Sequence, residues 1–503
     1  MRLVDMTSVL TGTKPDSTNL HVTEGTGWSS RTWVLLVVLA GALFLDGLDI
    51  SMVGVALPSI GEDLHMSPSA LQWIVSGYVL GYGGLLLLGG RSADLLGRRS
   101  VFLFAVGAFG IASVVSAFLS NDLALIALRF VKGVAAAFTV PAGLSIITTT
   151  FAEGPARNRA LSIYTVCGAS GFSMGLVFGG LLTELGWRMT FLLPGPAALL
   201  LLFAGLKVVP RAERQASSLK HFDLVGAFTS TASLLILVYA VVEAPARGWT
   251  SAATLGLLAA AIALAALFVA VELRHDHPLV RLGILRSARV VHANLAGAVM
   301  FGAYVSFQFV VTLYLQNALG WSPLAMALGF LPAGILVVAS VVKMGSVLQR
   351  FDTRLVIAAG LTSFALGYAL FLRVSPGMAY VNFLLPTMLL LGLGFALCFP
   401  SINSQATAGV ADHEQGLASG LVNTSLQIGG AVMLAVISAV IGAGDGVAKP
   451  DALLPGMTTA IQVIVGLTVV GVISTLAVVG FRRPAPQLAP VAVSRELEDC
   501  VAC

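Results

Sequence analysis

The sequence predicts an all-α integral membrane protein with fourteen transmembrane helices. Of its 503 residues, 57% are hydrophobic and only 10% are charged, whereas soluble domains carry roughly 25% charged residues. Because so few charges cannot cover a surface that faces water, we expect the chain to lie in hydrocarbon, where only helices and closed barrels satisfy every backbone polar group. Apolar runs of roughly 20 residues, instead of ten-residue alternating strands, indicate helices.

Fourteen apolar segments of spanning length follow one another along the chain. They lie near residues 33–57, 71–90, 101–119, 123–148, 160–183, 190–209, 224–243, 252–272, 290–315, 324–347, 354–373, 380–400, 417–442 and 457–481. The shortest connections are the polar pair Asn121-Asp122 and the run Gly186-Trp187-Arg188. Glycine and polar residues at such points are typical of turns.

The distribution of basic residues predicts the orientation, because cytoplasmic loops carry the excess of Lys and Arg. With a cytoplasmic N-terminus, 22 of the 28 Lys and Arg residues fall on the cytoplasmic side, four fall outside and two lie within the fourth segment. We therefore expect a multi-pass protein of the cell membrane with both termini in the cytoplasm. The formal net charge of +4 adds little to this pattern.

A weak internal repeat divides the chain into six, two and six helices. The basic loops after the second and tenth segments run from Gly90 to Arg99 and from Gly345 to Arg354, with the same spacing. Parallel repeats of this kind place a substrate site between the halves, near the middle of the membrane. The predicted parts are a tail (1–31), a first bundle (32–209), a two-helix insert (210–289), a second bundle (290–481) and a tail (482–503).

Four charged residues lie within predicted spans: Asp46 and Asp49 in the first, and Arg129 and Lys132 in the fourth. Burying an ion at the bilayer centre costs roughly 2.5 kcal/mol or more, so such residues pair in a polar interior. The i, i+3 spacing puts each couple on one helix face. One interpretation is a protonation switch at Asp49, or at Asp46, tuned by the two bases. The other is a static ion pair that joins two helices.

Two further patterns carry a functional and a structural interpretation each. Asp94 lies beside Arg98 and Arg99 in the loop that starts at Gly90 and contains Gly97. This loop either sets the topology or holds one access state closed through a carboxylate that accepts from arginines. The fifth segment carries glycines on one face, which suit either static packing or a sliding gate; they are Gly171, Gly175 and Gly179, followed by Gly180.

Other classes of function find little support in the residues. The four cysteines are scattered, and the Cys-x-x-Cys at Cys500 and Cys503 lacks the further ligands of a zinc site. No Walker loop predicts ATP as an energy source. The spans contain no His-Glu metal motif, and of the seven histidines only His292 lies near a span, which argues against an intramembrane enzyme. We expect no enzyme activity, no metal and no cofactor.

Taken together, these motifs resemble the major facilitator superfamily, specifically its fourteen-helix drug:proton antiporters, over residues 35–480. The matching residues are the run from Leu48 to Pro58 with Asp49 at its acidic position, the loop residues Gly90, Asp94, Gly97, Arg98 and Arg99, the pair Arg129 and Gly133, and the glycines 171, 175, 179 and 180.

The sequence departs from the family pattern at four positions. Leu95 stands where a base is usual, Lys132 replaces the usual Gln, Leu176 replaces a proline, and Asp46 is an additional acid. A missing proline removes a built-in kink, and an additional acid bears on how many protons are exchanged.

The resemblance implies proton-coupled export of small drug-like or antibiotic molecules, hydrophobic, amphipathic or cationic, across the cytoplasmic membrane of a bacterium. It implies Asp49 as the proton-coupling acid with Asp46 beside it, and Asp94, Arg98 and Arg99 as the cytoplasmic gate. Drug resistance, including self-resistance of an antibiotic producer, is the expected role. The alternative is a facilitator of another metabolite, such as an amino acid or siderophore. We expect no nucleic acid and no obligatory protein partner.

Overall fold

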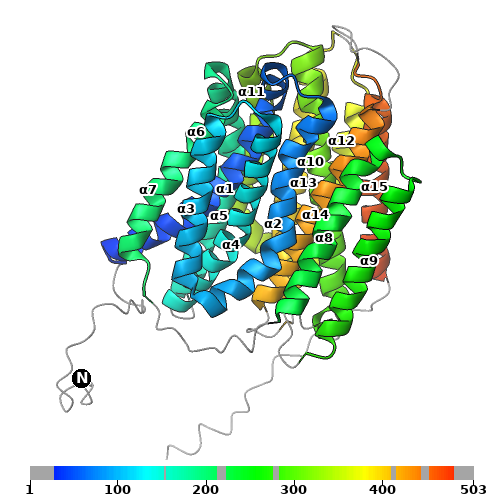
Figure 1. Cartoon of the computed structure of the whole chain (residues 1–503). Coiled ribbons are helices and arrows are strands. Elements are labelled where there is room, and N and C mark those ends of the chain that lie inside the picture. The colour runs from blue at the N-terminus through cyan, green and yellow to red at the C-terminus, as the bar shows by residue number, and fades with distance from the viewer. Residues whose placement is uncertain are drawn as a thin grey trace, which may run out of the picture.

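Long helices that run side by side make up the structure (Figure 1). The computed structural model describes residues 28–151, 155–211, 223–275, 282–375, 377–408, 410, 415–442 and 453–480. The remainder, which includes most of the predicted N-terminal tail and all of the predicted C-terminal tail with Cys500 and Cys503, lies outside the described residues. The first described helix begins, and the last ends, toward the same end of the bundle (Figure 1).

Every predicted spanning segment corresponds to helix. The elements are α1 (Ser30–Asp63), α2 (Pro68–Leu96), α3 (Arg98–Ala117), α4 (Asp122–Thr150), α5 (Pro155–Leu185), α6 (Met189–Leu192), α7 (Pro194–Val208), α8 (Leu224–Arg247), α9 (Ala252–Glu272), the 3-10 turn η2 (Leu282–Arg286), α10 (Ala288–Leu313), the π turn η3 (Tyr314–Ala318), α11 (Pro323–Arg350), α12 (Thr353–Phe371), α13 (Tyr380–Thr407), α14 (Gln415–Gly442) and α15 (Met457–Gly480). Within the described ranges, thirteen helical stretches are long and apolar enough to cross a membrane. The fourteenth segment is α2, a helix of 29 residues whose described apolar part is the shorter stretch Ala70–Leu86. The all-α membrane fold is therefore confirmed.

Local sequence signals explain where the first helices break. The Asn121 side chain accepts a hydrogen bond from the Ala124 N–H at 2.8 Å and so caps α4. Gly97 and Gly186 have φ of +93° and +127°, a region that favours glycine, and they form the turns before α3 and α6. The sixth predicted segment is a short helix followed by a longer one, because Pro194 begins α7.

The same packing pattern appears twice along the chain. In the first half, α1 packs on α5, α2 and α3 pack on α4, and α3 packs on α7; in the second half, α10 packs on α14, α11 and α12 pack on α13, and α12 packs on α15. The halves meet where α2 contacts α14 and where α5 contacts α11. Helices α2 and α11, which precede the two similar loops, thus occupy equivalent places. The insert helices α8 and α9 pack on each other, with α8 against α2 and α14.

Each half has a large apolar core cluster, and a smaller cluster joins residues of both halves. In the first half, buried Phe102 and Phe151 belong to one cluster, and in the second half Phe307 and Phe364 belong to another. The halves are therefore closely packed within themselves, and apolar contacts also join them to each other. The exact boundaries of the predicted parts (32–209, 210–289 and 290–481) stay predictions.

The glycines of α5 lie against α1, as their spacing predicts. A Cβ built at Gly175 would lie 2.5 Å from the Leu48 carbonyl oxygen, and one at Gly179 would lie 2.8 Å from Met52 Cα. Gly171 meets the backbone of Phe44 in the same way. Any side chain at these positions would push the two helices apart, so close helix contact requires glycine there.

We expect Gly175→Leu to destabilise the protein, because the added side chain has no room beside α1. Overpacking a core lowers the free energy of unfolding by about 1–3 kcal/mol when the neighbouring side chains can shift. Here the neighbour is helix backbone, which cannot shift as easily, so we expect a loss at the upper end of this range or above it. Thermal unfolding of the full-length protein in detergent measures the loss. Gly466→Leu on α15 is the matched control, since a Cβ there meets nothing within 4 Å; equal unfolding temperatures for the two variants would contradict the close-packing argument.

Candidate functional site

The structure brings the four predicted intramembrane charges together inside the first half. Asp46 and Asp49 project from α1, and Arg129 and Lys132 project from α4. All four are buried, with exposed fractions of 6%, 0%, 1% and 0% in that order. The predicted cluster of two acids and two bases is therefore present.

Asp49 forms ion pairs with both bases. Arg129 Nη1 donates to Asp49 Oδ2, and Lys132 Nζ donates to Asp49 Oδ1. The Arg129 Nε also donates to the Ile74 carbonyl of α2 at 3.0 Å, and its guanidinium lies 4.6 Å from the ring centre of Tyr78. Each carboxylate oxygen thus has its own cation, which compensates the loss of hydration on burial.

Lys132 joins this ion triad to two more helices. Its ammonium donates to Ser113 Oγ of α3 at 3.0 Å, and that hydroxyl donates to the Phe191 carbonyl of α6 at 2.8 Å. The rings of Phe109 and Phe191 lie 4.7 Å and 5.2 Å from the ammonium, within cation–π range. The position where the family has Gln therefore holds a charge with several specific partners.

Asp46 has different surroundings from Asp49. Its Oδ1 accepts a hydrogen bond from the Tyr78 hydroxyl of α2. Among the ion pairs of the described residues, none involves Asp46. Tyr82 lies one turn along α2, edge-on to Tyr78 at 6.1 Å between ring centres.

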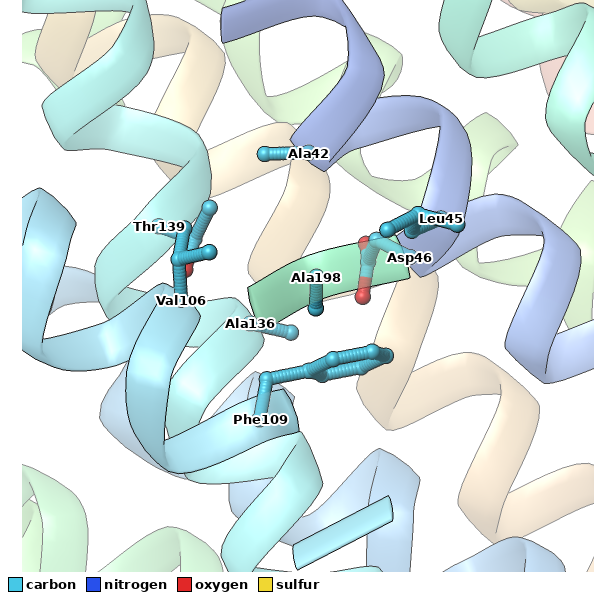
Figure 2. A pocket seen from close by; sticks show the side chains of 8 residues that line it. All are labelled: Ala42, Leu45, Asp46, Val106, Phe109, Ala136, Thr139 and Ala198. Atoms are coloured by element: carbon cyan, nitrogen blue, oxygen red, sulfur yellow. The ribbon is translucent and has the colours of Figure 1, made fainter. Parts of the chain in front are cut away.

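A cavity lies beside Asp46 (Figure 2). Its walls come from α1, α3, α4 and α7, all of the first half, and consist of Ala42, Leu45, Asp46, Val106, Phe109, Ala136, Thr139 and Ala198. Figure 2 shows the Asp46 carboxyl group directed toward Ala198 and the Phe109 ring. The cavity therefore brings together one carboxyl group and mostly apolar walls.

The predicted gate loop contributes contacts at the end of the bundle. Arg99 Nη2 donates to the Leu206 carbonyl at 2.6 Å, and its Nη1 donates to the Val209 carbonyl. The last carbonyls of a helix lack intrahelical donors, so Arg99 caps α7 while Gly97 makes the turn into α3. These contacts join helices of the same half.

The other gate residues are only partly defined. The side chains of Asp94 and Arg91 lie outside the described residues, although both positions are helical in α2. Arg98 is half-buried and has a partner. Gly90 faces Pro141 of α4, with 3.7 Å from a Cβ built there to the Pro141 Cβ. The proposed ion pairing of Asp94 stays a prediction.

Helix α5 bears on the contact between halves at two positions. Leu176, which stands where the family pattern has proline, is buried in the core cluster of the second half, and α5 runs from Pro155 to Leu185 without an internal proline. Gly180 faces α11: a Cβ there would lie 2.8 Å from Leu324 Cα. Of the predicted antiporter glycines, the three from Gly171 to Gly179 therefore face α1, and Gly180 faces α11 of the other half.

Several partners in the site carry no sequence signal. Tyr78, Ser113 and Phe191 look like ordinary span residues, and only the fold brings them to the charges. Within the described ranges, no three His, Cys, Asp or Glu side chains are arranged to hold a metal ion.

The chain is similar to known proteins both in sequence and in fold. Residues 39–434 match the sequence family described as the Major Facilitator Superfamily. The chain is 36% identical to the puromycin resistance protein of Streptomyces alboniger, over 85% of this chain and 86% of that protein. It is 35% identical to the cephamycin export protein of Amycolatopsis lactamdurans, over 85% and 89%. The fold is similar to the crystal structure of the POT family transporter PepTSo, with a TM-score of 0.68 and 14% identity over 90% of this chain and 98% of that one.

We expect Asp49→Asn to destabilise the protein more than Lys132→Met does. The first change leaves two buried cations side by side, whereas the second leaves the Arg129–Asp49 pair intact. Removing one partner of a buried pair costs about 3–5 kcal/mol. Thermal unfolding in detergent measures both effects.

The double variant Asp49→Asn/Lys132→Met is the control for this prediction. It should be more stable than Asp49→Asn alone, because it removes one of the two uncompensated cations. Strictly additive losses would contradict the ion triad.

Proposed function

This chain belongs to the major facilitator superfamily, and on that premise we propose that it exports small drug-like or antibiotic molecules across the cytoplasmic membrane in exchange for protons. The observation that carries the proposal is the buried charge cluster, since ionisable groups within spans mark proton and substrate pathways. Similarity to a puromycin resistance protein and a cephamycin export protein over most of the chain supports a drug or antibiotic as the cargo.

The arrangement of the two halves supports alternating access. Transporters built from repeats expose a central site to each side in turn by rocking one half against the other. Here Gln316 Nε2 of the π turn donates to the Val55 carbonyl of α1 at 3.0 Å, so a hydrogen bond joins the halves. Gly180 lets α5 approach α11 closely. Both contacts lie toward the end of the bundle opposite the described chain ends, and we assign that end to the outside.

An aromatic row between the halves supports an apolar or amphipathic substrate. The Tyr304 ring of α10 lies 5.8 Å from that of Phe172 in α5 and 5.6 Å from that of Phe395 in α13. All three rings are partly buried. Aromatic walls with few polar groups are typical of sites for drug-sized molecules, and they attract cations through their π faces.

Proton coupling would use the acids of α1. Asp49 and Asp46 are the proposed proton-coupling groups, and Arg129 and Lys132 set the charge around them. Arg99, with Arg98 and Asp94, would control the cytoplasmic gate, where Arg99 already holds the start of α3 to the end of α7. We assign the protein to the cell membrane of a bacterium, with both termini in the cytoplasm.

Proteoliposomes with an imposed pH gradient test the proposal, with radiolabelled puromycin and tetraphenylphosphonium as probes. We expect one of them to accumulate when the lumen is acidic, because protons leaving the lumen drive substrate in. A difference of one pH unit supplies about 1.4 kcal/mol per proton, which sustains roughly tenfold accumulation for one proton per substrate molecule.

The variant Asp46→Asn/Asp49→Asn should lose gradient-driven accumulation. Gly466→Leu, remote from the site, should keep it. If the wild type equilibrated the probes at the same rate and to the same level with and without the gradient, the protein would be a facilitator.

A further inference from the structure

The two acids of α1 lie one turn apart yet have different partners. From this difference we infer that Asp46, not Asp49, is the group that takes up and releases the exchanged proton, and that the proton reaches it through the cavity between α1, α3, α4 and α7. This inference rests on the proposed proton exchange. It moves the proton site one turn from the acid that matches the family pattern.

Asp49 is poorly suited to hold a proton. Its two oxygens accept from Arg129 and Lys132, and all three side chains are at most 1% exposed. Protonation would deprive both cations of their ion-pair partner in a site that is almost fully buried, which is strongly unfavourable. Asp49 acts instead as a permanent anion that keeps α1 and α4 together.

Asp46 has the features that Asp49 lacks. Its Oδ1 accepts from the neutral Tyr78 hydroxyl, so protonation breaks no ion pair. Its carboxyl group is directed into the cavity (Figure 2). Asp46 is 6% exposed, whereas Asp49 is fully buried. A proton that arrives on the cavity side can bind Oδ2 as the carboxylate becomes a carboxylic acid, while Tyr78 keeps its bond to Oδ1.

The size and chemistry of the cavity suit water and not a drug. The space that the centre of a water molecule can occupy there is about 10 Å³, close to the minimum that one water molecule needs and far too little for a drug-sized ligand. Thr139 is the other polar residue in its wall, and its hydroxyl donates to the Ala135 carbonyl at 2.9 Å. The Asp46 carboxylate is therefore the strong acceptor that the cavity offers to a hydrated proton.

The charges around Asp46 link its protonation to substrate binding. The titratable groups close enough to act on it are Asp49, Tyr78, Tyr82, Arg129, Lys132 and Tyr164. When Asp46 is ionised, the charges of the two acids and the two bases sum to zero. When Asp46 is protonated, the cluster carries a net charge of one positive unit. A buried positive charge acts over longer distances than one in water. Protonation thus disfavours a cationic substrate bound between the halves, which is the relation that antiport requires.

Infrared difference spectroscopy of the purified full-length protein tests the assignment directly. Spectra at acidic minus alkaline pH should show the C=O stretching band of a buried carboxylic acid in the wild type. We expect Asp46→Asn to remove this band and Asp49→Asn to keep it. Thermal unfolding confirms that each variant is folded, and Asp46→Glu, which retains a carboxyl group, should restore a band. A band that persists in folded Asp46→Asn, or disappears only in Asp49→Asn, would overturn the inference.

Tyr78→Phe supplies a second measurement with a definite sign. The hydroxyl donates to the ionised carboxylate and so favours it; its removal should move the midpoint of the band toward higher pH by about one unit. Tyr380→Phe in the second half is the control, because that hydroxyl donates to the Gly329 carbonyl at 3.0 Å. An unchanged midpoint in folded Tyr78→Phe would contradict proton uptake at Asp46.

Transport measured on the same variants separates this inference from the proposed function. Gradient-driven accumulation of puromycin or tetraphenylphosphonium that survives in Asp46→Asn would overturn the inference and leave proton-coupled export standing. Absence of gradient-driven transport in the wild type would overturn the proposed function, while the infrared band would still report which acid binds the proton.

Discussion

The pairing of Asp49 with two cations is the interaction on which the rest of the first half depends. Ions inside the bilayer are tolerated only where protein groups replace water, and here Arg129 and Lys132 do so. Their remaining donors reach α2 through the Ile74 carbonyl and α3 through Ser113. One buried carboxylate thereby fixes the relative positions of α1, α2, α3 and α4, and the cavity beside Asp46 exists because those helices are held in this arrangement.

The second half repeats the helix packing without repeating the charges. A Cβ built at Gly171 would collide with the Phe44 carbonyl of α1, and one at Gly429 would collide with the Ala298 carbonyl of α10 in the same manner. Counted from these contacts, the positions equivalent to the two acids of α1 are Met300 and Ala303, both buried in the apolar core. The second half therefore has apolar side chains at the positions where the first half carries its two acids. The motion that both halves share can then respond to a proton bound by one of them.

Close helix contact and charge burial act together on α1. On one side of α1, the glycines of α5 allow the backbones of the two helices to come close together. On the opposite side of α1, the two acids project toward α2, α3 and α4. A helix held so tightly on one side gives its charged side chains a fixed position, as a proton site requires. Leu176 adds to this rigidity, because α5 continues unbroken where the family pattern has a kink.

The sequence by itself determined the helical membrane fold, the number of its spanning segments, the meeting of four charges and the glycine face of α5. These features follow from local rules: hydrocarbon demands helices, and i, i+3 or i, i+4 spacing sets a face. Only the tertiary structure decided that Asp49 forms ion pairs with both cations while Asp46 accepts a hydrogen bond from Tyr78, and that Arg99 caps α7. Those choices depend on how helices distant in sequence are turned toward one another, which spacing within a single helix does not specify.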